Sequence, residues 1–164
     1  MENANSALLI VDVQKGFITD RTRHIPALVQ RAQEDHAHVF VCLFLNVPGS
    51  PFRTAFDWHG CTPGTEDCEP AFTPREDAVI IEKFGYSCVS EELLFHLRRF
   101  GVERVDVCGI DTDVCVLRTA SELFEKGVRV RVLKDLCATT AGEEVSDEAA
   151  FAVLARHIGK ENII

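Results

Sequence analysis

The succession of short apolar runs is the feature that most constrains the fold of this chain. Five runs are nearly unbroken in apolar residues, at 6–13, 39–47, 78–81, 104–108 and 128–133. Between them, apolar side chains recur with helical spacing at 25–34, 91–100, 114–126 and 146–157. Strands that lack polar alternation are typical of a parallel sheet covered on both faces. The pattern therefore predicts a three-layer α/β/α fold with a mainly parallel sheet, built from right-handed βαβ units.

The length of 164 residues fits one domain, and we expect it to span residues 1–164. One segment departs from the alternation of strands and helices. Residues 48–74 contain five of the six prolines and the single tryptophan, so we expect a long structured loop there. Long loops inside compact domains are often functional.

The charge and the cysteine content exclude several classes of protein. A formal net charge of -9 argues against nucleic acid and anionic membranes as main partners, which leaves a small molecule or a protein as the expected partner. The first residues lack the basic region of a signal peptide, and no apolar run approaches the roughly 18 residues of a membrane span, so we expect a cytoplasmic protein.

The seven cysteines are odd in number, and Cys42, Cys108 and Cys137 fall in or beside apolar strands. This distribution argues against a disulfide framework.

Three polar residues follow predicted strands at the edge where parallel α/β sheets bind ligands. Asp12 ends the first run, Lys83 follows the third, and Cys115 follows the fourth at the start of a predicted helix. Each has a simple structural alternative: an aspartate that caps a turn, a solvated lysine, a buried cysteine. Together they supply an acid, a cation and a thiol, which is the composition of an activated cysteine nucleophile. A helix N-terminus and a nearby ammonium favour the thiolate, so we expect a useful fraction of Cys115 thiolate at neutral pH.

Four segments carry a resemblance to a known family. They are residues 8–17 (LLIVDVQKGF), Trp58 with 63–65 (PGT), 81–87 (IEKFGYS) and 109–116 (GIDTDVCV). In these segments and in their order, the chain resembles the isochorismatase-like cysteine hydrolases, which include nicotinamidases and N-carbamoylsarcosine amidohydrolase. The resemblance covers nearly the whole chain and implies a Rossmann-like fold.

The resemblance also implies roles for individual residues. Asp12, Lys83 and Cys115 would form the catalytic triad. The backbone N–H groups of Asp111 and Cys115 would form the oxyanion hole, next to a cis peptide bond between Ile110 and Asp111. The aromatic residues expected to contact substrate are Phe17, Trp58 and Tyr86, with Phe84 as a further candidate for the pocket wall. The resemblance further implies a homo-oligomer.

The chain departs from metal-binding nicotinamidases. Asn46 stands where those relatives have an aspartate ligand, and Gly60 rather than a histidine precedes Cys61. Because the ligand set is incomplete, we predict no metal cofactor. The alternative is zinc held by Asp57, His59, Cys61 and Cys68.

The side chain of Asp111 stands where many relatives carry a small or neutral residue. It either favours a substrate with an amino or hydroxyl group or points to solvent.

These residues predict a cysteine-dependent hydrolase that acts on carbon–nitrogen bonds other than peptide bonds. It would cleave a small amide, carbamoyl or ureide compound through a thioester on Cys115. The presence of this cysteine argues against isochorismatase activity itself, since isochorismatases proper lack it. The alternatives are an inert binding or scaffold protein and a metal-assisted amidase of the nicotinamidase type. A redox role lacks support, because no Cys-x-x-Cys pair is present.

Overall fold

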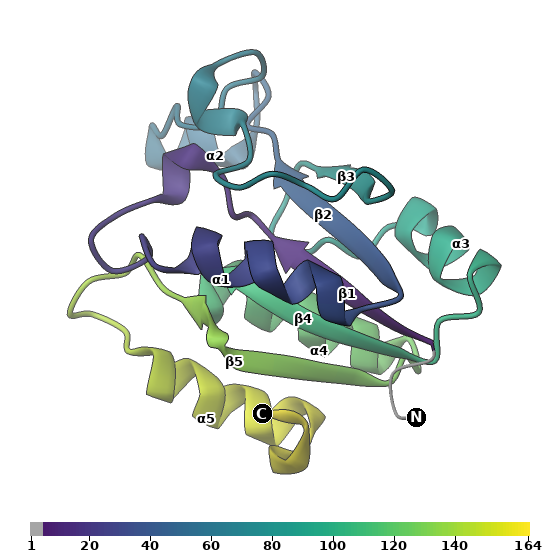
Figure 1. The fold of residues 1–164 in the computed structure, drawn as a ribbon. Helices are drawn as coiled ribbons and strands as arrows, with labels where there is room; N and C mark the ends of the chain where they lie inside the picture. Colours follow the sequence, from purple (N-terminus) through teal and green to yellow (C-terminus); the bar gives the residue numbers. More distant parts are fainter. Residues whose placement is uncertain (1–4) are drawn as a thin grey trace.

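The computed structural model describes residues 5–164, which form a five-stranded sheet in which every strand pairs in parallel. The spatial order is β3-β2-β1-β4-β5 (Figure 1). The strands are β1 Ser6–Val11, β2 His38–Phe44, β3 Val79–Lys83, β4 Arg104–Ile110 and β5 Val130–Ala138. All six residues of β1 are buried, as expected for the central strand of a sheet covered on both faces. The predicted α/β class with a parallel sheet is confirmed.

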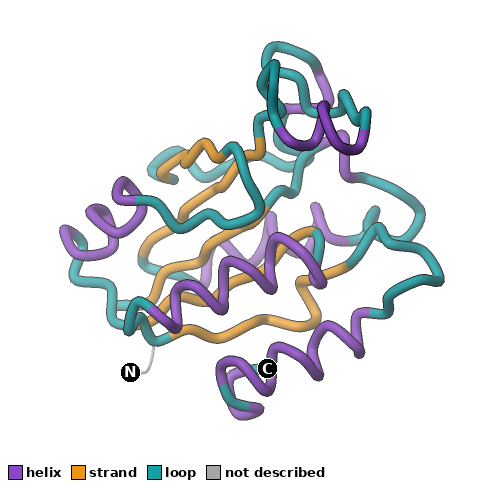
Figure 2. The backbone as a smooth tube through the Cα atoms, turned by 180° about the vertical axis from the view of Figure 1, so that it is seen from behind, coloured by secondary structure: helices purple, strands orange, loops and turns teal. Residues whose placement is uncertain are grey.

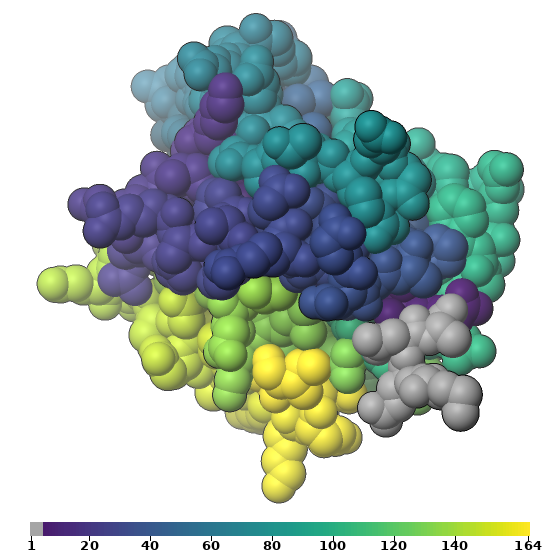
Figure 3. All heavy atoms as spheres, viewed as in Figure 1, coloured from purple at the N-terminus to yellow at the C-terminus, as the bar shows by residue number. Residues whose placement is uncertain are grey.

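Helices cover the sheet on both faces. They are α1 Ile25–Ala32, α2 Pro51–Phe56, α3 Glu91–Arg99, α4 Leu117–Glu125 and α5 Asp147–Ile158. Helix α1 lies over one face, while α3 and α4 lie behind the sheet (Figures 1 and 2). In the space-filling view of this face, the atoms of α1 cover the middle of the sheet, and green atoms of the β5 region remain visible below them (Figure 3). None of the helices in residues 5–164 is long and apolar enough to cross a membrane.

The boundaries differ from the prediction in two places that matter for the site. The helix expected at 114–126 begins with a π-helical turn, Thr112–Val116, and only then continues as α4. Such turns are rare and frequently occur at functional sites. The segment expected to be a loop, 48–74, contains the short helix α2 and a 3-10 turn at Glu66–Cys68. Ser50 begins α2 as its N-cap, and its side chain accepts a hydrogen bond from the N–H of Arg53.

Gln14 fastens the end of β1 to its surroundings. The side chain is fully buried, and its Nε2 donates to the carbonyls of Phe44 at 3.0 Å and Cys68 at 2.9 Å. Its Oε1 accepts from the N–H of Phe44 at 2.8 Å. One amide therefore joins the carboxyl ends of β1 and β2 to the loop above the sheet. These hydrogen bonds stabilise the fold, because a buried amide costs least free energy when its donors and its acceptor are all hydrogen-bonded.

Gly109 permits the close approach of β4 to β1. Its φ is +126°, and a Cβ placed on it would lie 2.0 Å from the carbonyl oxygen of Val11. No side chain fits at that distance, and only glycine adopts this backbone conformation readily. The position lies one residue before Ile110, so the path of the chain into the π-helical turn depends on it.

We predict that Gly109→Ala will lower the free energy of unfolding by about 3 kcal/mol or more, because the methyl group must displace the backbone of β1. Gly127→Ala is the matched control, since it has a positive φ of +78° but no atom within 4 Å of the added Cβ. Urea denaturation followed by circular dichroism measures both. A loss for Gly109→Ala no larger than that for Gly127→Ala would contradict the steric explanation.

Candidate active site

The three residues predicted to be catalytic lie together at the carboxyl edge of the sheet. Asp12 follows β1, Lys83 ends β3, and Cys115 lies in the π-helical turn after β4. The Nζ atom of Lys83 is 2.8 Å from Oδ2 of Asp12 and 3.3 Å from Sγ of Cys115. Strand β2 separates β1 from β3, so the lysine side chain has to cross this strand end to reach both partners.

Lys83 is held in place by the chain that follows it. Its ammonium donates to the carbonyl oxygens of Gly85 and Tyr86, each at 2.9 Å. It also lies 5.3 Å from the ring centroid of Phe44, within the range of a cation–π interaction. The side chain is almost entirely buried, so these contacts replace the water that a lysine normally keeps. Its position is therefore fixed before any substrate arrives.

Burial and mutual interaction shift the pKa values of all three groups. Burial raises the pKa of Asp12, and the attraction of Lys83 offsets only part of that rise. Burial alone would lower the pKa of Lys83, but the interactions with Asp12, Cys115 and Cys88 together outweigh it and the net shift is upward. Burial and the Asp12 carboxylate raise the pKa of Cys115 well above its usual value, against the opposing effect of Lys83. The upward shifts of Lys83 and Cys115 favour an ammonium and a neutral thiol, and the ion pair with Lys83 favours the charged form of Asp12.

The direction of the Cys115 pKa shift is opposite to the one expected for a thiolate at neutral pH. The attraction of Lys83 acts in the expected direction, but burial and the negative charge of Asp12 are larger. Both effects disfavour an anion on sulfur. A neutral thiol is a weaker nucleophile than a thiolate, and the carboxylate that interacts with this thiol is that of Asp12.

The backbone before Cys115 carries the peptide groups that were expected to form the oxyanion hole. The Ile110–Asp111 peptide bond is cis. After it, the carbonyl of Asp111 accepts hydrogen bonds from the N–H groups of Val114 at 3.3 Å and Val116 at 3.0 Å. Cys115 lies between these two donors in the π-helical turn. Its backbone N–H, one of the two expected donors of the oxyanion hole, therefore belongs to the same turn as its thiol.

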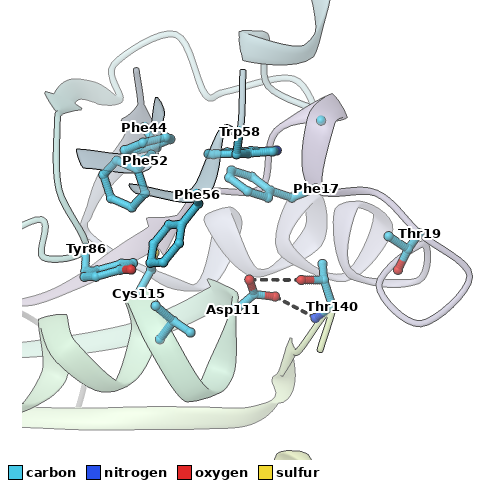
Figure 4. A pocket seen from close by; sticks show the side chains of 12 residues that line it. Phe17, Thr19, Phe44, Phe52, Phe56, Trp58, Tyr86, Asp111, Cys115 and Thr140 are labelled. Carbon is cyan, nitrogen blue, oxygen red and sulfur yellow. Dashed lines mark hydrogen bonds between the residues drawn. The ribbon is translucent and has the colours of Figure 1, made fainter. Parts of the chain in front are cut away.

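A cavity of about 370 Å³ opens above Cys115. Most of its wall is aromatic, and the six aromatic residues that line it are Phe17, Phe44, Phe52, Phe56, Trp58 and Tyr86 (Figure 4). Its other side chains come from Thr19, Asp111, Val114, Cys115 and Thr140. The volume fits a single small molecule whose apolar part lies against the aromatic rings.

The sequence prediction of the wall was incomplete. Phe17, Trp58 and Tyr86 all line the cavity, whereas Phe84 is 54% exposed and lies outside its lining. Phe44, Phe52 and Phe56 were missed. The latter two lie on α2, which the sequence analysis treated as loop, so their helical spacing of four residues was the signal available.

The residues considered for a metal do not form a site. Asn46 is buried, and its Nδ2 donates to the carbonyls of Trp58 at 2.8 Å and Gly60 at 3.0 Å. Its Oδ1 accepts from Ser50 at 2.5 Å, so its polar atoms are all engaged in holding the loop. No group of three or more histidine, cysteine or carboxylate side chains in residues 5–164 is arranged to bind a metal ion.

The alternative zinc set is divided between two environments. His59 and Asp57 pair with each other at 3.1 Å, and both side chains are exposed. The thiols of Cys61 and Cys68 are buried and directed at carbonyl oxygens of their own loop. A zinc site needs its ligands to converge tetrahedrally on one point, which these four do not do.

Comparison with known proteins places the chain in a family. Residues 6–160 match the family model of the isochorismatase domain. The nicotinamidase/pyrazinamidase of Mycobacterium tuberculosis is 33% identical, over 90% of this chain and 91% of that protein. The nicotinamidase of Acinetobacter baylyi is 29% identical, over 84% and 83%. The crystal structure of Pyrococcus horikoshii pyrazinamidase in complex with zinc superposes with a TM-score of 0.81 and 26% identity, over 97% of each chain.

The parallel sheet, the cavity at its carboxyl edge and these matches define the chain as a hydrolase. It belongs to the isochorismatase family, as the four sequence segments predicted.

We predict that Asp12→Asn will raise the rate of alkylation of Cys115 by iodoacetamide at pH 7.5 by about tenfold. Removing the carboxylate charge lowers the pKa of the thiol while Lys83 continues to stabilise the thiolate. Intact-protein mass spectrometry with peptide mapping identifies the modified cysteine.

Glu82→Gln is the control for this experiment, because Glu82 is an exposed carboxylate next to Lys83. It should leave the alkylation rate unchanged. A slower or equal rate in Asp12→Asn would contradict the proposed effect of Asp12 on the thiol.

Proposed function

We propose that this chain hydrolyses a small amide, carbamoyl or ureide compound through a thioester on Cys115. The observation that carries the proposal is the position of the Lys83 ammonium, which lies within 3.3 Å of both the Asp12 carboxylate and the Cys115 thiol below the cavity. A base, a cation and a nucleophile in mutual contact are what acyl transfer to sulfur requires.

In the first half-reaction, Sγ of Cys115 attacks the carbonyl carbon of the substrate while Asp12 takes the thiol proton. The carbonyl oxygen becomes an oxyanion, for which the N–H groups of Asp111 and Cys115 are the proposed donors. The tetrahedral intermediate collapses as Asp12 returns the proton to the leaving nitrogen. Ammonia or an amine departs, and the acyl group stays on sulfur. The raised pKa of Asp12 suits this exchange, because a base with a higher pKa accepts a thiol proton more readily.

In the second half-reaction, water attacks the thioester carbonyl while Asp12 takes a proton from it. The same two N–H groups stabilise the second oxyanion. Its collapse breaks the carbon–sulfur bond, and Asp12 returns the proton to the Cys115 sulfur as the acid is released. Lys83 stabilises negative charge on whichever of its two partners carries it, since it contacts both. One carboxylate thus serves both half-reactions.

The first compounds to test follow from the relatives and from the cavity. The named activities of two relatives are on nicotinamide and pyrazinamide, which are carboxamides of flat aromatic rings. A cavity of about 370 Å³ lined by six aromatic side chains suits such rings. Nicotinamide, pyrazinamide and benzamide are therefore the first substrates to assay. Homo-oligomeric assembly and a cytoplasmic location stay predictions from the sequence.

We predict that Cys115→Ala will lower turnover of the best amide by about a thousandfold or more, because no acyl carrier remains. Cys137→Ala is the control, since that thiol is buried beside Leu133 and lies outside the cavity lining. Ammonia release measures turnover, and rapid acid quench with mass spectrometry detects the acyl group on Cys115. Retained activity in Cys115→Ala would overturn the mechanism. Absence of turnover in the unaltered protein across a panel of amides and ureides would favour the inert binding protein.

We also propose that turnover needs no metal, because Asn46, His59 and Cys61 do not converge as ligands. Dialysis against a chelator should leave kcat/KM within about twofold of its starting value, and added zinc should not raise it. The double variant Asp57→Asn/His59→Ala should behave in the same way. Loss of activity on chelation with recovery on zinc addition would favour the metal-assisted alternative.

A further inference from the structure

The wall of the cavity carries one charge among the described residues that line it. That charge belongs to Asp111, while the other lining side chains are aromatic, aliphatic, hydroxyl or thiol groups. Lys83 and Asp12 lie below the lining and compensate each other as an ion pair. A substrate in the cavity therefore meets the carboxylate of Asp111 as its charged neighbour.

The carboxylate of Asp111 is held rigidly. It accepts hydrogen bonds from the N–H of Thr140 at 2.6 Å and from its hydroxyl at 3.0 Å, one on each oxygen (Figure 4). Thr139 and Asp113 form a second link between the same two segments. A carboxylate has about four acceptor positions, and these bonds use two of them. The remaining lone pairs are available to a ligand.

The charge of Asp111 has no compensating cation. None of the ion pairs formed within residues 5–164 includes this residue. The two nearby carboxylates, Asp113 and Asp147, add negative charge. The exposed Arg21 donates its Nε to the carbonyl of Thr139 at 3.4 Å, and no ion pair with Asp111 is formed. The side of the cavity formed by Asp111 and Thr140 is therefore negative.

Resting on the proposed function, we infer that Asp111 determines the charge specificity of the enzyme. It accepts amides and ureides that are neutral or carry a cationic group, and it rejects those that carry a carboxylate. A second carboxylate in the cavity would be repelled by Asp111 and could gain nothing from the aromatic wall. An ammonium group would be attracted by Asp111 and by the negative faces of Phe17 and Trp58.

The charge of Asp111 distinguishes between the substrate classes that the sequence left open. Carboxamides of neutral or basic rings fit, whereas N-carbamoyl amino acids, which retain a carboxylate, do not. It also bears on release, because hydrolysis of a neutral amide creates a carboxylate in the same cavity. Repulsion from Asp111 then favours departure of the product acid.

Three probes on one ring test the inference: benzamide, 3-(aminomethyl)benzamide and 3-carbamoylbenzoate, which are neutral, cationic and anionic at pH 8. Calorimetric titration of the Cys115→Ala protein measures binding without turnover. We expect the cation to bind about tenfold or more tightly than the anion. Asp111→Asn in the same background should reduce this ratio about tenfold, since asparagine removes the charge but can keep both contacts with Thr140.

Asp113→Asn is the matched control, because it removes the same charge from the same turn but not from the cavity lining. It should lower the ratio by less than Asp111→Asn does, because its charge lies outside the lining. The ranking of the probes on the protein with Asp111 present decides the matter even if Asp111→Asn does not fold. Equal binding of cation and anion, an unchanged ratio in folded Asp111→Asn, or no binding of any probe would each overturn the inference.

Failure of the proposed function gives a different result. If the probes bind in the expected order but the protein with Cys115 releases no ammonia from any amide, the inference stands and the proposed hydrolysis fails. If amides are hydrolysed with no discrimination by charge, the hydrolysis stands and the role of Asp111 fails.

Discussion

The buried ion pair between Asp12 and Lys83 is the interaction on which the rest of the site depends. Its members come from β1 and β3, so it forms only when the ends of three neighbouring strands are in register. Buried ion pairs contribute little net stability, yet loss of one partner costs about 3–5 kcal/mol because a charge is left uncompensated. The pair is therefore better explained by chemistry than by stability. It keeps a base and a cation in contact with the Cys115 thiol in an environment that neither would occupy alone.

The two carboxylates of the site, Asp12 and Asp111, lie in different environments. Asp12 is buried against a lysine, so its charge is compensated, and its proposed role is proton transfer. Asp111 is fixed by Thr140 and has no cation beside it, so its field reaches the cavity. A single aspartate could not do both, because a proton-transfer base must contact the nucleophile, whereas a selector must face the substrate. Asp111 lies on the wall directly before the π-helical turn, whereas Asp12 lies outside the lining in contact with Lys83.

The loop above the sheet is held by the buried side chain of Asn46. A zinc complex is described for the pyrazinamidase of Pyrococcus horikoshii. In this chain the amide of Asn46 bonds to Trp58, Gly60 and Ser50, and so fastens the loop by hydrogen bonds. An amide is neutral and carries both donors and an acceptor, which suits it to joining backbone groups. Asn46 can thus hold Trp58 over the cavity by hydrogen bonds, without a metal.

The sequence by itself determined the parallel sheet, the family and the meeting of Asp12, Lys83 and Cys115, because apolar runs and strand-end residues are local patterns that survive without coordinates. It could not determine the protonation of Cys115, which depends on burial and on the distance to Asp12. Nor could it assign Phe44, Phe52 and Phe56 to the cavity, since their positions depend on how α2 packs above β2. Only the tertiary structure showed that Asp111 faces the cavity rather than solvent, because its partner Thr140 is 29 residues away. The local sequence pattern thus identified the functional groups, whereas tertiary packing determined their burial and the neighbouring charges that act on them.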